Sequence, residues 1–265
     1  MIKSNPAKKL LSEGKPTFGT WITLCPHPRI VKILSAAGFD FVIIEMEHTD
    51  FSFETVARLA MLAREAGVVP VVRPPGTLKP HDLTRPLDAG AQGLLLPAVD
   101  SAEQMREIIH ATKYYPLGNR PMNLKGPHTD YHDGSPQEII EHLNAHTLTV
   151  VMIESPKAIE NLDDILGVDG VDCIMLGPDD LSQEMGIPGD MRNPKLLDAF
   201  DHVFATCRKH NVPYGLSCHS PELAEKWVGK GATWLPYSND AAIVLNAMRA
   251  VVPKLMEIGG RTATE

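Results

Sequence analysis

Eight short apolar runs recur along this 265-residue chain, and each is followed by a segment with the spacing of a helix. Continuous apolar stretches of this kind are typical of parallel strands that are buried on both faces. Strands that alternate with helices in eight units predict an α/β fold, a TIM (β/α)8 barrel. The runs lie at 18–24, 39–46, 68–73, 91–97, 148–154, 171–177, 211–218 and 232–237.

The eight units follow one another without a linker, so residues 1–265 are expected to form a single barrel domain. The alternation is irregular only at about 114–147, where a long loop precedes one short helix. Long loops inside compact domains are usually functional or disordered. We expect this insertion to reach the mouth of the barrel, with His128 and His132 lining it.

Composition narrows the class of partner. The formal net charge is −8 and the basic residues form no run, which argues against nucleic acid and anionic membranes as partners. No apolar stretch reaches the ~18 residues of a membrane-spanning helix, and the N-terminal segment lacks the apolar region of a signal peptide. The four cysteines include no CxxC pair, as is usual in a reducing compartment. We therefore expect a soluble, cytoplasmic protein.

Four of the apolar runs end in, or are closely followed by, a polar residue of a catalytic type, namely His48, Arg73, Glu154 and Asp180. In a TIM barrel, the residues just past the C-terminal ends of the strands build the active site. These four side chains are therefore expected to converge on one mouth. This convergence predicts an enzyme.

Glu154 and Asp180 belong to consecutive units of the predicted barrel. Neighbouring parallel strands lie about 4.8 Å apart, so carboxylates at their ends can bind one ion. Two carboxylates that leave several positions open suit a hard divalent cation such as Mg²⁺ or Mn²⁺. The alternative is that these acids only cap helices or lie in loops, and for Asp179 we favour the cap.

Three further features point to an acidic substrate and a base. Gly177 and Pro178 stand at a predicted helix start, where free N–H groups bind anions. The guanidinium of Arg73 suits bidentate binding of a carboxylate, although a salt bridge at the rim explains it equally well. Because histidine side chains generally titrate near neutral pH, a histidine at position 48, beside the acids Glu45 and Glu47, is suited to act as a base.

Other polar residues carry weaker signals. His142 and His146 are four residues apart on a helix, but no third metal ligand is evident, so an exposed helix face is the simpler interpretation. Asp88 is expected to be an exposed helix residue, and Arg120 a loop anchor or an anion contact. No lysine lies within an apolar run, which argues against a Schiff-base aldolase. The loops after the last two runs have no glycine-rich turn, which disfavours a phosphorylated substrate.

Together these segments resemble the class II pyruvate aldolases of the HpcH/HpaI type, which include 4-hydroxy-2-oxo-heptanedioate and 2-dehydro-3-deoxyglucarate aldolases. The resemblance extends through nearly the whole chain. It is carried by FGTW (18–21), AGFDFVIIEMEH (37–48), VVRP (71–74), LDAGAQGLLLP (87–97), YPLGNR (115–120), VMIES (151–155) and GPDDLSQEMG (177–186).

The resemblance implies a role for each matching residue. Glu154 and Asp180 would be ligands of a divalent metal ion, either Mg²⁺, Mn²⁺ or Co²⁺. Arg73 would hold the oxygens of pyruvate. His48 would be the base, oriented by the acid at position 45.

The resemblance also implies substrate contacts and an assembly. The backbone at Gly177, Pro178 and Asp179 would bind the substrate carboxylate, while Asp88 would enter the site of a neighbouring subunit. The assembly would be a homo-hexamer, a trimer of dimers, with the last helix exchanged between paired subunits. Trp21, Leu216 and the 119–134 loop are expected to line the substrate pocket.

The chain departs from the family at Glu45, where an aspartate is common, and at Met152, where a glutamine is often found. These changes concern the orientation of the base and the aldehyde side of the pocket. The reaction expected from the sequence is reversible cleavage of a 4-hydroxy-2-oxo acid into pyruvate, or a close 2-oxo acid, and an aldehyde. Two alternatives are a CoA-thioester lyase of the citrate or malyl-CoA type and a non-catalytic 2-oxo-acid binding protein.

Overall fold

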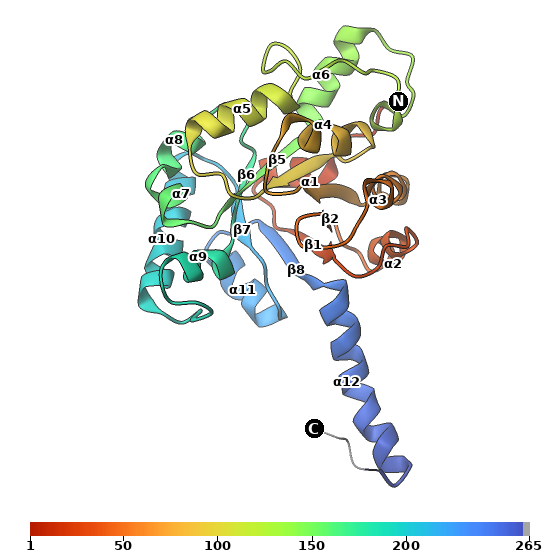
Figure 1. Cartoon of the computed structure of the whole chain (residues 1–265), viewed down its shortest axis with the longest axis vertical. Coiled ribbons are helices and arrows are strands. Elements are labelled where there is room, and N and C mark those ends of the chain that lie inside the picture. Colours follow the sequence, from red (N-terminus) through yellow and green to blue (C-terminus); the bar gives the residue numbers. More distant parts are fainter. Residues whose placement is uncertain (262–265) are drawn as a thin grey trace.

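The computed structural model describes residues 1–261 and contains a closed barrel of eight parallel strands in sequence order (Figure 1). This architecture confirms the predicted TIM barrel. Seven of the eight strands are shorter than the corresponding apolar runs, because several runs continue into the turns beyond the last paired residue. They are β1 (Thr17–Ile22), β2 (Phe41–Glu45), β3 (Val69–Arg73), β4 (Gly93–Leu96), β5 (Leu148–Ile153), β6 (Cys173–Leu176), β7 (Tyr214–Leu216) and β8 (Trp234–Asn239).

Helices surround the barrel and return the chain from the end of one strand to the start of the next. Those that follow β1 to β4 are α2 (Ile30–Ala36), α3 (Phe53–Ala66), α4 (Pro80–Asp88) and α5 (Ala102–Thr112). Those that follow β5 to β8 are α7 (Pro156–Glu160), α8 (Leu162–Leu166), α9 (Pro178–Glu184), α10 (Pro194–Lys209), α11 (Pro221–Gly229) and α12 (Asp240–Ile258).

The apolar side chains of the strands alternate between two cores. On β2, Val42 and Ile44 belong to the cluster between barrel and helices, while Phe41 and Ile43 belong to the cluster inside the barrel. Inside, the ring of Phe41 stacks on that of Trp234 with 3.6 Å between centroids. This alternation decides which strand-end side chains face the interior and therefore the mouth.

A short helix that the sequence analysis did not predict closes the N-terminal end of the barrel. Helix α1 (Pro6–Ser12) places Ala7 and Leu11 in the inner cluster. Its start carries two recognisable signals, because Asn5 caps the helix by accepting a hydrogen bond from the Lys8 N–H, and a proline occupies its first position.

The insertion at 114–147 lies at the same N-terminal end of the barrel. The expectation that it lines the mouth of the barrel is therefore wrong within one subunit. Helix α5 brings the chain back to the starts of the strands, and η1 (Pro127–Thr129) and α6 (Pro136–His146) follow before β5 begins. His128 is buried there, bonded to the Asp88 carbonyl, and His132 is exposed.

Helix α12 projects from the barrel at the end of the molecule opposite the N terminus (Figure 1). Its start is anchored by Asp240, which accepts hydrogen bonds from the N–H groups of Thr23 and Cys25 at 2.9 and 2.8 Å. Within residues 1–261, no helix combines the length and apolar character needed to cross a membrane. The exposed apolar side chains of α12 are Val244, Leu245, Met248, Val251, Val252, Leu255 and Ile258.

Candidate active site

Glu45 and Arg73 occupy paired positions at the C-terminal ends of β2 and β3. Each follows, at a spacing of two, an apolar residue that faces the barrel interior, so both side chains face inward. The Glu45 Oε2 accepts a hydrogen bond from the Arg73 Nε at 2.5 Å and also lies 2.5 Å from one terminal nitrogen of the guanidinium. Because Glu45 is only 1% exposed and Arg73 is mostly buried, this is a desolvated, charge-assisted ion pair made through one carboxylate oxygen.

Glu45 holds the backbone of the next residues and not the imidazole of His48. Its Oε1 accepts hydrogen bonds from the N–H groups of Glu47 and His48 at 2.6 and 3.2 Å. The His48 side chain is 67% exposed, and its Nε2 lies 3.8 Å from a carboxylate oxygen of Glu47. In this chain, therefore, the acid beside the imidazole is Glu47, and Glu45 orients the turn that carries His48.

Glu47 is a site residue whose importance the sequence analysis did not recognise. One of its carboxylate oxygens lies 3.5 Å from an Arg73 nitrogen. Burial raises the pKa of this carboxyl, and its effect is larger than that of the positive charges of Arg73 and His48, which lower the pKa. Gly76 makes room for it, since a Cβ there would be 2.6 Å from a Glu47 oxygen. The feature of the sequence that could have identified Glu47 as a site residue is its position two residues after Glu45.

Glu154 lies at the same mouth, directly after β5. Its Oε1 accepts a hydrogen bond from the Ala98 N–H at 2.6 Å, and Ala98 has a left-handed φ of 52°. Burial raises the pKa of Glu154, and the negative charges of Asp180 and Glu47 raise it further. Three carboxylates thus act on one another electrostatically at this mouth, with Arg73 as an opposing positive charge.

This arrangement fits a divalent cation bound by Glu154 and Asp180. Gly177 leaves space beside Glu154, because a Cβ at position 177 would lie 2.8 Å from the Glu154 Oε2. Within residues 1–261, no three His, Cys, Asp or Glu residues group closely enough to form a complete metal site. Two carboxylates alone would leave an octahedral ion with open positions for water and substrate oxygens.

Helix α9 begins at the mouth, next to Glu154. Gly177 is its N-cap and Pro178 its first residue, so Asp179 and Asp180 both lie in its first turn. The expectation that Asp179 caps the helix was wrong. Asp179 and Asp180 are both exposed, and the start of α9 is where we expected the substrate carboxylate to bind.

Trp21 and Met152 stand beside the arginine. The Arg73 guanidinium lies over the Trp21 ring at 4.8 Å from its centroid, and the Trp21 Nε1 donates to the Ser217 hydroxyl at 3.2 Å. The Met152 sulfur is 3.9 Å from an Arg73 nitrogen. Leu216 differs from expectation: it belongs to the cluster between barrel and helices, because alternation along β7 turns it away from the interior.

Asp88 and Arg120 lie far from this mouth within one subunit, at the N-terminal end of the barrel. Asp88 is the last residue of α4 and forms an ion pair with the buried guanidinium of Arg120. Arg120 is therefore a loop anchor, which is one of the two roles that the sequence analysis considered for it. His142 and His146 are half-buried and not on an exposed face, since their ring nitrogens bond the backbone of Lys3 and Asn5.

A closed TIM barrel with carboxylates, an arginine and a histidine at its C-terminal mouth has the arrangement of an enzyme active site. Over residues 18–247 the chain matches the HpcH/HpaI aldolase/citrate lyase family, and it belongs to that family. The chain is accordingly an enzyme, a carbon–carbon lyase of the aldolase type.

Relatives and solved structures agree with this assignment. A 4-hydroxy-2-oxo-heptane-1,7-dioate aldolase of Shigella sonnei is 30% identical over 94% of both chains. A 2-keto-3-deoxy-L-rhamnonate aldolase of Klebsiella pneumoniae is 30% identical over 93% of this chain and 91% of its own. The crystal structure of an HpcH/HpaI aldolase from Desulfitobacterium hafniense superimposes with a TM-score of 0.89 at 35% identity, covering 94% of this chain and 96% of that one.

Proposed function

We propose that this enzyme reversibly cleaves a 4-hydroxy-2-oxo acid into pyruvate, or a close 2-oxo acid, and an aldehyde, and that it requires a divalent metal ion. The C3–C4 bond breaks, its electrons remain on C3 as an enolate, and C4 becomes the aldehyde carbon. A proton then returns to C3 to give the 2-oxo acid. The two relatives described above, both named as aldolases of 2-oxo acids, support the proposal.

The residues of the mouth suit the charges of this reaction. Glu154 and Asp180 would hold the metal ion, which when bound would stabilise as a Lewis acid the negative charge on the keto oxygen. Arg73, held by Glu45, would bind the oxygens of the 2-oxo acid and add positive charge where the enolate forms. The backbone at Gly177, Pro178 and Asp179 would bind the substrate carboxylate.

His48 would remove the proton from the 4-hydroxyl group, either directly or through a water molecule. The neighbouring Glu47 carboxylate, 3.8 Å from the imidazole, would stabilise the imidazolium that results. Trp21 would form one wall of the pocket through its contact with Arg73. The observation that carries this proposal is the convergence of Glu47, Glu154 and Asp180 with Arg73 at one mouth.

Chelation of the metal tests the proposal. Protein stripped with a chelator should lose aldol cleavage and regain it with Mg²⁺, Mn²⁺ or Co²⁺. The variants Glu154→Ala and Asp180→Ala should lose metal binding measured by calorimetry, while His48→Ala should keep it and lose turnover. Glu103→Gln, an exposed acid on α5, is the matched control and should behave as the wild type. Full activity after complete metal removal would contradict the proposal.

Two assays separate this activity from its alternatives. A pyruvate-enolate site should also release CO₂ from oxaloacetate, since decarboxylation forms the same enolate. Cleavage of an acyl-CoA but not of a free 4-hydroxy-2-oxo acid would instead indicate a CoA-thioester lyase. Pyruvate binding without any turnover would indicate a binding protein.

We further propose a homo-hexamer in which α12 is exchanged between paired subunits and Asp88 completes the site of a neighbour. The row of exposed apolar side chains on α12 supports the exchange, because water-exposed apolar surface of this size usually marks an interface. The outward-facing Phe18 on β1, which is 40% exposed, offers apolar surface that such a helix would cover. We also propose that the enzyme is located in the cytoplasm.

A further inference from the structure

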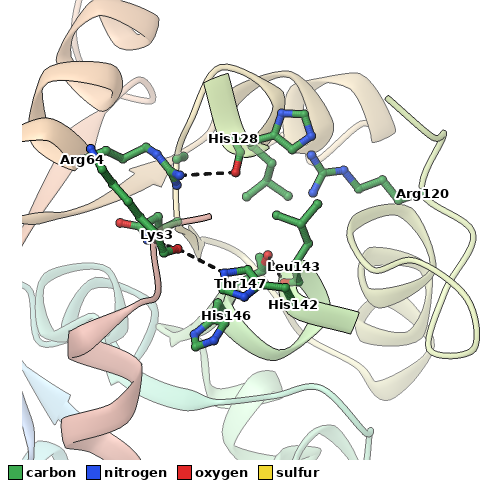
Figure 2. A pocket seen from close by; sticks show the side chains of 11 residues that line it. Lys3, Arg64, Arg120, His128, His142, Leu143, His146 and Thr147 are labelled. Atoms are coloured by element: carbon green, nitrogen blue, oxygen red, sulfur yellow. Dashed lines mark hydrogen bonds between the residues drawn. The ribbon is translucent and has the colours of Figure 1, made fainter. Parts of the chain in front are cut away.

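A small cavity at the N-terminal end of the barrel is lined by basic side chains (Figure 2). Its volume is about 20 Å³, which is the space of one water molecule or one monatomic ion. Among the lining residues within 1–261, none is an aspartate or glutamate. The basic side chains that line it are Lys3, Arg64, Arg120, His128, His142 and His146.

Two arginines face this cavity with hydrogen-bond donors to spare. The Arg64 and Arg120 side chains are 5% and 2% exposed, and their guanidinium groups point toward the space between them (Figure 2). Each uses a terminal nitrogen for an ion pair, with Asp130 and Asp88 respectively, and neither acid lines the cavity. Within residues 1–261, the Nε of both arginines has no hydrogen-bond partner. A buried donor without an acceptor is rare and costly.

His128 is a titratable group in this wall, and both of its ring nitrogens contact backbone carbonyl oxygens. Its Nε2 lies 2.7 Å from the Asn123 carbonyl oxygen, and its Nδ1 lies 3.2 Å from the Asp88 carbonyl oxygen. Carbonyl oxygens only accept hydrogen bonds, and a neutral imidazole has one N–H, so only the cationic ring satisfies both contacts. Burial and the charge of Arg120 oppose that cation and lower the pKa of His128. A negative charge in the cavity would relieve the conflict.

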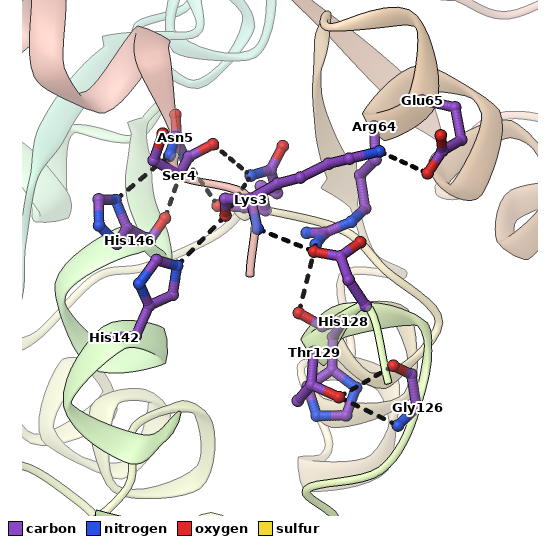
Figure 3. A network of polar contacts seen from close by, with 12 residues as sticks. Lys3, Ser4, Asn5, Arg64, Glu65, Gly126, His128, Thr129, His142 and His146 are labelled. Carbon is purple, nitrogen blue, oxygen red and sulfur yellow. Dashed lines mark hydrogen bonds and ion pairs between the residues drawn. The ribbon is translucent and has the colours of Figure 1, made fainter. Parts of the chain in front are cut away.

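The remaining wall is rigid. The N-terminal segment is bound to α6 and to the β4 entrance, because His142 bonds the Lys3 carbonyl, His146 accepts from the Asn5 N–H, and the Asn5 amide donates to the Gln92 carbonyl (Figure 3). The Lys3 N–H donates to Asp130, the partner of Arg64. A cavity framed in this way keeps its shape, so the donors are preorganised for a ligand.

We propose that this cavity binds one small monovalent anion, of the size of chloride or bromide, between the guanidinium groups of Arg64 and Arg120. A cavity of about 20 Å³ has the size for a single monatomic ion. The anion would accept hydrogen bonds from the two free Nε–H groups. Its role would be to stabilise the junction of the N-terminal segment, α3, α5 and α6.

Anion-dependent stability tests this proposal on the full-length protein. The melting temperature, measured in sodium gluconate and sodium chloride at equal ionic strength, should be higher in chloride and should saturate with chloride concentration. The Arg64→Gln variant should lose this difference. Arg58→Gln, on the same helix but in an exposed ion pair with Glu54, is the matched control and should keep it.

A bromide-containing crystal of the wild type provides a second, independent measurement. An anomalous peak between Arg64 and Arg120 is expected, and a water molecule at that position would overturn the proposal. An equal melting temperature in gluconate and chloride, or a chloride effect that survives in Arg64→Gln, would overturn it too. A bromide peak without any chloride-specific stabilisation would mean binding at crystal concentration only. That outcome would also overturn the proposal, because the site would not be occupied in solution.

Discussion

The carboxylate of Glu45 binds both the guanidinium of Arg73 and the backbone N–H of His48, through its two separate oxygens. One buried acid thus positions the proposed substrate clamp on β3 and the proposed base in the turn after β2. The length of the glutamate side chain lets it make both contacts from the end of β2.

We predict that Glu45→Gln lowers both stability and turnover. The substitution leaves the mostly buried Arg73 without its ion-pair partner, which costs about 3 kcal/mol of unfolding free energy, the low end for buried pairs. We expect a loss of stability at the low end because Arg73 keeps one acidic neighbour, a Glu47 oxygen 3.5 Å from an Arg73 nitrogen. Urea denaturation measures the loss. Glu54→Gln, which breaks an exposed ion pair with Arg58, should leave stability nearly unchanged. Wild-type stability in Glu45→Gln would refute the role assigned to the pair.

We predict that the stability of this protein rises with pH through Lys113. Burial lowers the pKa of Lys113 from 10.5 to about 8, while its Nζ donates to the Thr147 carbonyl at 2.7 Å. Between these two pKa values the unfolded chain binds more protons than the folded one, so the free energy of unfolding increases with pH. The increase amounts to about 3 kcal/mol across that window.

The Lys113→Met variant should lack this increase, so the free energy of unfolding of the wild type should rise relative to that of the variant as the pH rises. Denaturation curves at about pH 7.5 and about pH 10 measure it, and taking the difference removes the titration of other groups. Lys125→Met, an exposed lysine of the same region, is the control. A pH-independent difference for Lys113→Met would show that the lysine titrates normally.

We predict that two inactive variants restore activity when they form mixed assemblies. Asp88 lies at the opposite end of its own barrel from His48, so it can reach only the His48 of a neighbouring subunit. Asp88→Ala and His48→Ala should each be nearly inactive alone. Co-expressed in equal amounts, they should assemble about a quarter of their sites from one intact Asp88 and one intact His48. Absence of any recovery in a confirmed mixed hexamer would place Asp88 outside the active site.

We predict that the apolar face of α12 drives assembly. The double substitution Leu245→Glu and Val252→Glu places charges where an exchanged helix would bury apolar side chains. Sedimentation velocity should then show species smaller than the hexamer expected for the wild type. Lys254→Glu, on the same helix but already polar, is the control. A variant that sediments as the wild type would show that α12 is not an interface.

The apolar runs were sufficient to predict the barrel, because a parallel strand buried on both faces leaves an unbroken hydrophobic stretch in the sequence. The same reasoning placed Arg73 and Glu154 at the mouth, since each directly follows such a run. The position of the 114–147 insertion was also deducible. It follows a helix and precedes a strand, and in a β/α unit that junction lies at the N-terminal end of the barrel.

Other features could not be obtained this way. Leu216 faces outward because of the local alternation of a three-residue strand, whose register is uncertain in a short apolar run. Helix α1 has only seven residues, and it is stabilised by burying Ala7 and Leu11 against side chains that are distant in sequence. Short helices of this kind depend on tertiary packing more than on their own sequence.

The local order of apolar and polar residues was enough to predict the eight-unit barrel and the acids, arginine and histidine at the strand ends. Three-dimensional packing was needed to show that Glu45 binds Arg73, that Glu47 lies beside His48, and that Arg64 and Arg120 converge on one cavity. Each of these pairings depends on strand register or on the meeting of separate helices and loops, and such distances are not encoded in any local pattern.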